Sequence, residues 1–420
     1  MVEAIRLENG MTLVAEQAPW QQGVSLGLFV RGAVVDEPAG QEGIAHLLEH
    51  LVFRGTERYA GTDLSAAVEE DGGELNAYTT KEYTCLWGRT LPEALPRFLE
   101  ILSELFVRPL LRPRDLAREV QVIEEEYSLW TDSPEEFTCD LLEEEIFRGT
   151  PLARRVLGDP QALRALRAQD VRSFHAAAWR VERAVLAVAG PVSVQEIAEI
   201  ATRSFRPSPL GRPSRRAAPA APAPLLQPPQ VGQVHLAVGG PALAFGDPAL
   251  AAQDLLIQEF GGGPNSRLFQ RLRERDALSY SVYSYETAYA QGGMWGVYAD
   301  LPPDGLSDGI AAILEEAGAL RAARLGERRL ASMRRASRGA LLLSLDAPFA
   351  RVERQALQIL LRGQAEAVEE ELLRLQAVDA ASLRLAAQRV LDPTIWRAVA
   401  LLPDGRLLRG SVRELGEVGA

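Results

Sequence analysis

The order of expected secondary structure repeats once along this chain, and this repeat is the strongest constraint on its fold. The first copy runs strand, helix, helix, strand, strand, over residues 23–32, 46–53, 63–73, 74–80 and 83–91. The second copy runs in the same order at similar spacing, over residues 233–240, 251–263, 266–277, 279–290 and 293–300. Internal duplication is the simplest account. The sequence therefore predicts an α+β fold of two homologous halves, each an antiparallel sheet with helices packed on one face.

A change in composition separates the halves. Residues 205–230 are rich in Pro and Ala and show no apolar periodicity, which indicates a semi-extended linker. We therefore predict an N-terminal domain at 1–204 and a C-terminal domain at 231–420. Each is long enough to bury its own core.

Composition excludes several classes of protein. The net charge is -12, and no basic footprint for nucleic acid is present. We expect no membrane association, since no apolar run reaches about 18 residues and the N-terminus does not resemble a signal peptide. The two cysteines, Cys85 and Cys139, are far apart and suit a reducing compartment, so we expect a cytoplasmic protein.

Two of the four histidines fall within His46-Leu47-Leu48-Glu49-His50. A chance match to this pattern is expected on the order of 0.005 times in such a chain. On a helix, His46 and His50 point the same way and can bind one Zn²⁺, while Glu49 flanks the metal as a general base. The bland alternative is a surface helix with two solvated histidines.

Catalytic zinc needs a third protein ligand and an open position for water. Read as a helix, residues 114–127 bury Leu116, Val122 and Ile123, and Glu119 and Glu126 project from that same face, seven residues apart. We assign Glu126 as the ligand and Glu119 as the group that orients a histidine or the ligand itself. Two alternatives stay open: Glu125 as the ligand, or a solvated acidic face.

These motifs resemble the pitrilysin/insulinase family of zinc peptidases, whose motif is inverted, H-x-x-E-H. The resemblance covers nearly the whole chain, including GIAHLLEHLVFRGTERY, GGELNAYTTKEYT, REVQVIEEEYSLW and SRLFQRLRERDALSYSVYS. It implies that the two halves form part of a clamshell chamber holding one zinc ion per chain. It also implies peptide substrates and a dimer of two such chains, a homodimer or a heterodimer with a related chain.

Further site residues are implied by the resemblance alone. Asn76 and Ala77 match a strand that binds the substrate backbone as an added strand. Arg273 and Tyr280 match an arginine–tyrosine pair that binds substrate carbonyls and donates to the developing oxyanion. Ala277 departs from the family, which commonly has glycine there. A charged surface helix and a packed strand tyrosine are the alternative interpretation.

We therefore predict a zinc-dependent endopeptidase that hydrolyses unfolded peptides or short chains, with Glu49 activating water. Glu119 and Tyr280 assist catalysis. The main alternative is a catalytically silent or partner-dependent peptide-binding subunit of a heterodimeric peptidase. A non-proteolytic hydrolase, such as an amidase, is a further alternative, although the strand at Asn76 favours extended peptides.

Overall fold

The computed structural model describes residues 2–206, 228–322 and 325–418. The described residues form two compact units, each with its own sheet and hydrophobic core. The first unit draws on residues 1–126, 149–223 and 343–366, and the second on 127–148, 224–342 and 367–420, as far as these are described. The predicted linker at 205–230 lies mostly outside the described residues.

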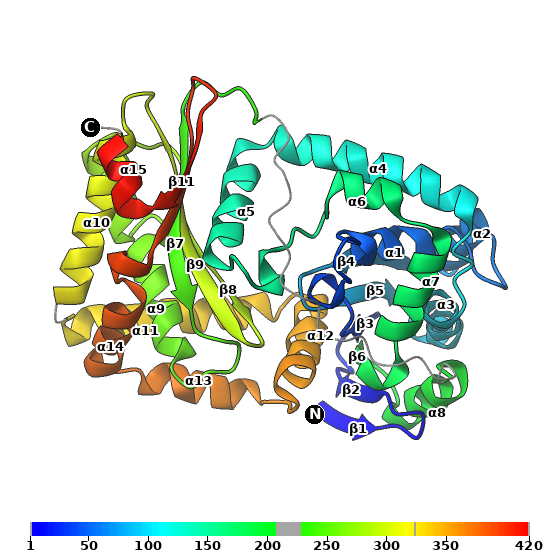
Figure 1. Ribbon diagram of the computed structural model, residues 1–420. Helices are drawn as coiled ribbons and strands as arrows, with labels where there is room; N and C mark the ends of the chain where they lie inside the picture. Colours follow the sequence, from blue (N-terminus) through cyan, green and yellow to red (C-terminus); the bar gives the residue numbers. More distant parts are fainter. Residues whose placement is uncertain (1, 207–227, 323–324, 419–420) are drawn as a thin grey trace. The chain divides into compact units, whose positions relative to one another are not determined.

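The first unit is built on a six-stranded sheet in the order β1-β2-β6-β3-β5-β4 (Figure 1). All neighbours are antiparallel except β2 and β6, which are parallel. The central strands β3 and β6 are buried at every residue and, apart from Ser25, apolar, as expected for strands covered on both faces. The strands are β1 Val2–Arg6, β2 Thr12–Gln17, β3 Val24–Val30, β4 Glu74–Thr79, β5 Thr84–Thr90 and β6 Ala184–Gly190.

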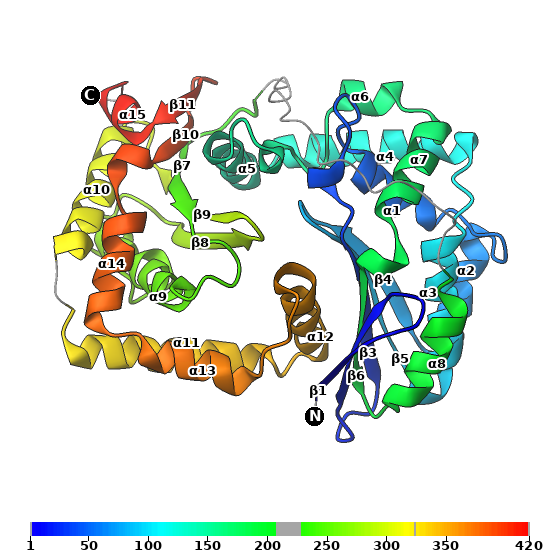
Figure 2. The ribbon, with the colours of Figure 1, turned by 60° about the horizontal axis from the view of Figure 1, so that its bottom comes forward.

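Helices of the first unit cover both faces of this sheet. Figure 2 shows α12 on one face and α3 and α8 on the other. The apolar core on the α12 face includes Phe29, Cys85 and Val352. The helices are α1 Ile44–Val52, α2 Gly61–Glu69, α3 Leu95–Val107, α4 Pro113–Thr131, α6 Pro160–Ala165, α7 Ala168–Ala178, α8 Val194–Ser204 and α12 Pro348–Leu357.

The second unit repeats this design on a five-stranded antiparallel sheet in the order β11-β10-β7-β9-β8. Helix α5 contacts β7, β9 and β10, while α9 and α14 lie on the other face (Figure 1). The strands are β7 Val234–Ala242, β8 Val282–Tyr289, β9 Gly292–Leu301, β10 Arg397–Leu401 and β11 Leu407–Ser411. The helices are α5 Pro134–Ile146, α9 Leu250–Gly261, η5 Phe269–Arg275, α10 Leu306–Ala322, α11 Glu327–Ser344, α13 Val368–Ala377, α14 Ala380–Val390 and α15 Val412–Val418.

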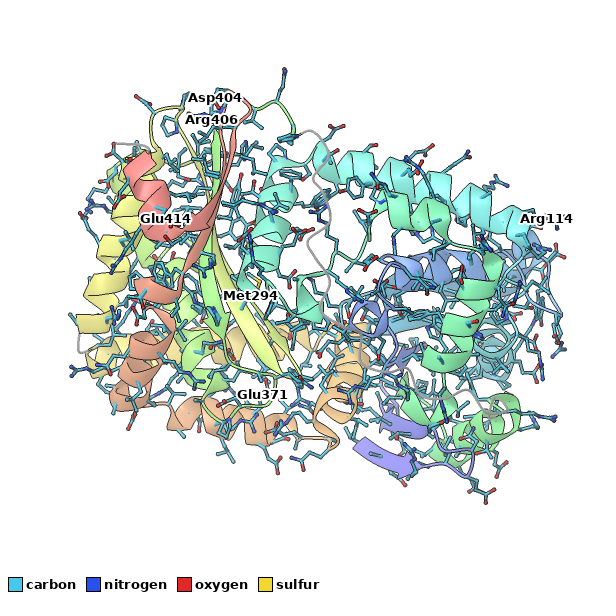
Figure 3. The ribbon with its side chains drawn as sticks, in the orientation of Figure 1. Arg114, Met294, Glu371, Asp404, Arg406 and Glu414 are labelled. Atoms are coloured by element: carbon cyan, nitrogen blue, oxygen red, sulfur yellow. The ribbon has the colours of Figure 1, made fainter. Side chains whose placement is uncertain are left out.

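Local ion pairs support the turns of these elements. Asp404 and Arg406 lie in the turn between β10 and β11 (Figure 3), and their side chains form an ion pair of 2.7 Å. Gly405 between them has φ of +82°, a conformation that glycine adopts without strain. Arg114, also labelled in Figure 3, marks the N-terminal end of α4.

The fold class predicted from the sequence is confirmed, with antiparallel sheets and helices in each half. The structure adds helical cover on the second face of each sheet, by α12 on the first sheet and by α5 on the second. These helices are exchanged: α5 precedes the linker but packs on the second sheet, and α12 follows it but packs on the first. The compact units therefore differ from the continuous segments 1–204 and 231–420, because each sheet needs apolar cover on both faces. No described helix combines the length and the apolar content that crossing a bilayer requires.

A buried carboxyl group holds the start of α1. Oε1 of Glu37 accepts hydrogen bonds from the backbone N–H groups of Gly43 and Ala45, at 3.1 and 3.0 Å, so it caps the first turn of the helix. Gly43 has φ of +95°, and a Cβ there would lie 3.0 Å from the Cα of Gly158. Glycine is thus required at this position, where the backbone before α1 packs closely against Leu157 and Gly158.

Burial raises the pKa of Glu37 from its ordinary value of 4.5 to about 8, against the opposing effects of the two backbone hydrogen bonds and Arg154. Between these pH values the folded chain holds a proton that the unfolded chain has lost. Glu37 therefore makes the free energy of unfolding decrease as pH rises from 4.5 to about 8, with a slope approaching about 1.4 kcal/mol per pH unit.

We predict that Glu37→Gln flattens this pH dependence, because the amide keeps an acceptor oxygen for Gly43 and Ala45 and does not titrate. Urea unfolding at pH 5 and pH 8 measures it in both proteins. Equal pH dependence in the two would contradict an inward-facing carboxyl group that is protonated in the folded state.

Candidate metal centre

Helix α1 separates an apolar face from a polar one. Ile44, Leu47, Leu48 and Leu51 are buried in the core of the first unit. His46 and His50 lie one turn apart, with ring centroids 4.6 Å apart and side chains only 12% and 15% exposed. The i, i+4 spacing predicted from the sequence therefore places two neighbouring imidazoles at the margin of the core.

A carboxylate from α4 meets both imidazoles. One ligand atom each from His46, His50 and Glu126 lie within 4.8 Å of one another. Nε2 of His46 is 3.6 Å from Oε2 of Glu126, and Nε2 of His50 is 3.6 Å from Oε1. These separations are too long for hydrogen bonds but close to the roughly 3.3 Å between ligands in a tetrahedral zinc site. The three residues therefore fit a zinc ion, with donor atoms of the kind that zinc prefers.

Burial favours the uncharged form of His46. Its pKa falls from 6.5 to about 3, mainly through loss of hydration and secondarily through the neighbouring His50. The imidazole is therefore neutral near pH 7 and has a free lone pair, which metal binding requires.

Helix α4 directs the side chain of Glu126 toward the two histidines, while the neighbouring glutamates point elsewhere. Ile123 and Tyr127 are buried on the core side, and Val120 takes the buried position expected of Val122, which is only half-buried. Glu125 is exposed, and Glu124 accepts from Nε of Arg164 at 2.6 Å. The described geometry thus favours Glu126 over Glu125.

Glu119 lies seven residues earlier on α4 and contacts one of the two histidines, His50. Its Oε2 lies 3.3 Å from Nδ1 of His50, the ring nitrogen other than the one facing Glu126. The Glu119 side chain is only 2% exposed. This is the arrangement in which a carboxylate fixes the tautomer and the ring orientation of a metal-binding histidine.

Glu49 occupies the position of a base beside the ligands. Burial raises the pKa of its carboxyl group, although a hydrogen bond from Thr79 opposes this. The Thr79 hydroxyl donates to Oε2 of Glu49 at 2.5 Å. A carboxyl group with a raised pKa is a stronger base and suits proton transfer near neutral pH.

Strand β4, which begins at Glu74, ends at Thr79, the residue that donates to Glu49. Within the described part of the chain β4 pairs only with β5, so it is the edge of its sheet. Asn76 is exposed, and its Oδ1 accepts from the backbone N–H of Ala77 at 2.8 Å. An edge strand presents backbone groups to which an extended peptide can pair. Asn76 and Ala77 therefore lie on a strand suited to peptide binding, and that strand leads to Thr79 and Glu49.

The other two implied residues belong to the second unit. Nη1 of Arg273 donates to the backbone carbonyl of Tyr280 at 2.8 Å, and its guanidinium lies 4.6 Å from the centre of the Tyr280 ring. Tyr280 is 76% exposed, which does not fit the alternative of a packed strand tyrosine. The structure thus brings Arg273 and Tyr280 together within their own unit.

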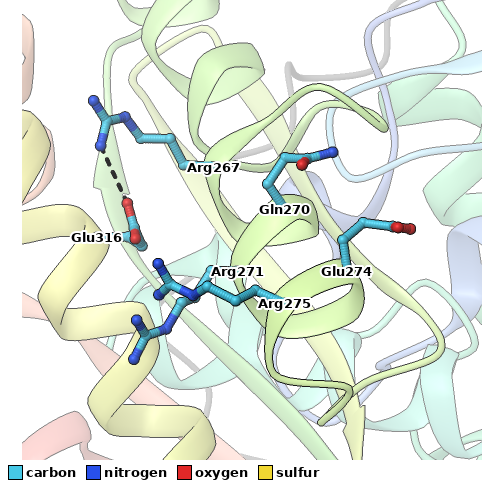
Figure 4. A pocket seen from close by; sticks show the side chains of 6 residues that line it. All are labelled: Arg267, Gln270, Arg271, Glu274, Arg275 and Glu316. Atoms are coloured by element: carbon cyan, nitrogen blue, oxygen red, sulfur yellow. Dashed lines mark hydrogen bonds and ion pairs between the residues drawn. The ribbon is translucent and has the colours of Figure 1, made fainter.

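Arg273 also differs from the arginines beside it. Arg267, Arg271 and Arg275 are among the residues that line a cavity of about 490 Å³ (Figure 4). Acidic side chains pair with all three, including Glu316 with Arg267 at 3.1 Å. Among the described residues no carboxylate pairs with Arg273, whose guanidinium instead lies near the Phe269 and Tyr280 rings. The local charge pattern thus leaves this arginine available to a ligand.

Three residues at the site were not predicted from the sequence. Glu37 caps α1, Thr79 holds Glu49, and Arg54 pairs with Glu119 at 2.5 Å. Glu37 follows a 3₁₀ turn and Arg54 lies in a turn, where no periodicity reports the direction of a side chain, whereas Thr79 ends a strand. The alternation in residues 74–80 could have signalled only Thr79.

We predict that Glu126→Ala loses stoichiometric zinc, because both imidazoles face this carboxylate, whereas Glu125→Ala keeps it. The variants remove the same group from adjacent positions, so the second controls for charge and helix propensity. Metal analysis of the dialysed proteins measures the difference. Loss of zinc from Glu125→Ala alone would reverse the ligand assignment.

Comparison with known families divides the chain into two matched segments. Residues 12–160 match the family model described as insulinase, peptidase family M16. Residues 165–337 match the model described as the peptidase M16 inactive domain. His46, His50 and Glu126 all fall in the first segment, and Arg273 and Tyr280 fall in the second.

Curated relatives match over nearly the full length. An uncharacterized zinc protease of Streptomyces coelicolor is 31% identical over 400 residues, covering 93% of this chain and 87% of the relative. The uncharacterized zinc protease YmxG of Bacillus subtilis is 27% identical, covering 90% and 93%. Both names agree with the donor set found here.

Solved structures show the same fold. A protease from Helicobacter pylori superposes with a TM-score of 0.85 at 21% identity, covering 96% of this chain and 99% of that one. A peptidase M16 inactive domain from Pseudomonas fluorescens gives 0.84 at 18% identity, covering 95% and 97%. Together with the full-length relatives, these matches confirm the resemblance read from the sequence: the chain belongs to the insulinase family, peptidase family M16.

Proposed function

We propose that this chain is a zinc-dependent endopeptidase that hydrolyses unfolded peptides or short chains. The observation that carries the proposal is the convergence of His46, His50 and Glu126, with Glu49 beside them on α1. Three protein ligands leave a fourth position open, as in catalytic rather than structural zinc sites. We expect one zinc ion per chain.

The residues around the site supply the proton transfers. When bound, Zn²⁺ polarises the scissile carbonyl and lowers the pKa of water toward about 7. Glu49 accepts a proton from the attacking water as the new carbon–oxygen bond forms. It donates that proton to the amine nitrogen as the carbon–nitrogen bond breaks. The Thr79 hydroxyl holds the Glu49 carboxylate by donating to Oε2.

The edge strand β4 supports a peptide as the substrate class. An extended chain paired to this edge would be bound through its backbone, with little dependence on its sequence. The N–H of Ala77 is bonded to the side chain of its neighbour Asn76, so a docking peptide would take over that donor. This element favours a peptidase over an amidase acting on small molecules.

Arg273 and Tyr280 are proposed to act on the bound substrate from the second unit. Arg273 would bind substrate carbonyl groups, and the Tyr280 hydroxyl would donate to the developing oxyanion. The exposure of Tyr280 and the absence of a carboxylate partner for Arg273 among the described residues support these roles.

We further propose that the chain acts as a homodimer in the cytoplasm, around a closed peptide chamber. A heterodimer with a related chain is the alternative. The family resemblance supports the dimer, and the two free cysteines suit a reducing compartment. Gel filtration together with activity of the lone purified chain separates a homodimer from a partner-dependent subunit.

We predict that the chain cleaves an internally quenched unstructured peptide, that a chelator abolishes cleavage and that zinc restores it. Glu49→Gln should lower kcat by about 10²–10⁴-fold and keep zinc, because the amide cannot accept the proton. Near-normal turnover by Glu49→Gln would sink the assignment of the base. A chain that holds zinc but cleaves nothing would instead support the peptide-binding subunit.

We also predict that Tyr280→Phe lowers kcat roughly 10²–10³-fold while zinc content stays unchanged, as for loss of an oxyanion donor. Arg273→Ala should raise KM as well. Arg275→Ala is the matched control, since Arg275 already pairs with Asp276. Equal effects of the Arg273 and Arg275 variants would support the charged-surface alternative for this helix.

A further inference from the structure

The two histidines of the metal centre differ in their polar contacts. Nδ1 of His50 contacts Glu119, whereas Nδ1 of His46 is buried and has no hydrogen-bond partner in the described part of the chain. Zinc-binding histidines usually donate their second N–H to an acceptor, which fixes the ring. Of the two imidazoles, His50 is therefore the one whose orientation is set by a polar contact.

The contact between Glu119 and His50 depends on a carboxylate that is buried. The side chain of Glu119 is 2% exposed, and a buried carboxylate is costly unless a cation pairs with it. Nε of Arg54 lies 2.5 Å from Oε1 of Glu119. The contact is an ion pair rather than an aligned hydrogen bond, since Oε1 has no hydrogen bond of its own. Each oxygen of Glu119 thus has one neighbour, Arg54 on one side and His50 on the other.

The backbone of Arg54 is itself fixed between the two ligand-bearing helices. Its N–H donates to the carbonyl of Leu51 at 3.0 Å, in the turn that ends α1. Its carbonyl accepts from Nη2 of Arg112 at 2.6 Å, and Arg112 pairs with Asp115 in the first turn of α4. Arg54 therefore links the end of α1 to the start of α4.

We propose that Arg54 is a positioning residue of the metal centre, which holds Glu119 against His50 and thereby sets the affinity for zinc. The proposal rests on the metal site described above. Without Arg54 the Glu119 carboxylate loses its cationic neighbour and is free to turn its oxygens away from Nδ1 of His50. His50 would then lose the polar contact that orients its ring.

The zinc dissociation constant of the full-length metal-free chain, measured by competition with a chelator, tests this. Arg54→Met should weaken binding about 10–100-fold, the usual effect of removing a group that orients a ligand. Arg54→Lys should be intermediate, because an ammonium keeps the charge but lacks the planar guanidinium. Arg58→Met is the control: it removes the same charge from an exposed position four residues on, where Arg58 contacts the Tyr59 ring, and should leave affinity unchanged.

A second substitution shows whether Arg54 acts through Glu119. In a Glu119→Gln background, Arg54→Met should weaken zinc binding no further, because the group that it positions is already altered. The absorption spectrum of the Co²⁺-loaded chain should change in Arg54→Met and return toward the original in Arg54→Lys. A general effect on folding would not produce this pattern.

The outcomes separate the two proposals. Failure of the unsubstituted chain to bind zinc would overturn the metal site itself. Tight binding by that chain and equally tight binding by Arg54→Met would overturn only the role of Arg54, as would additive losses in the double variant. If thermal unfolding shows that Arg54→Met does not fold, the Lys variant replaces it. In the Glu119→Gln background, Arg54→Lys should then cause no further loss of zinc affinity. A further loss there would contradict the proposal.

Discussion

Two imidazoles and a group of carboxylates face one another between α1 and α4, and this concentration of polar groups at the edge of an apolar core needs a cation. Burial keeps His46 neutral, so it cannot neutralise the carboxylates beside it. Arg54 forms an ion pair with Glu119. Among the described residues the carboxylate of Glu126 lies 3.6 Å from each of the two imidazoles and forms no ion pair with arginine or lysine, which suits a bound divalent ion.

The candidate ligands could be predicted from the sequence because regular helices place them. His46 and His50 are one turn apart, and Glu119 and Glu126 are two turns apart, so periodicity alone puts each pair on one face. The groups that hold them could not be predicted, because they lie in turns or at strand ends. Arg54 reaches Glu119 across 65 positions of sequence, and such a contact depends on how two helices pack.

The fold shows the same division between local and non-local information. Strand and helix order followed from local patterns, which predicted helices on one face of each sheet, whereas the structure has helical cover on both faces. The sequence did not show which helix provides that second cover. An apolar face on a helix predicts that this face is buried, but it does not indicate which element it packs against. The exchange of helices α5 and α12 between the sheets therefore appears only in the structure.

The two units also show why duplication does not duplicate chemistry. In each, the first helix makes a polar contact to the edge strand: Glu49 with Thr79 in the first unit, and Gln253 with Glu286 at 3.0 Å in the second. Gln253 also accepts from the backbone N–H of Leu243 at 2.9 Å, so its amide ties helix and strands together. An amide cannot accept a proton near neutral pH, and α9 contains no histidine. Both units have a polar link at this position, and in the first unit that link includes Glu49, a base beside the candidate metal ligands.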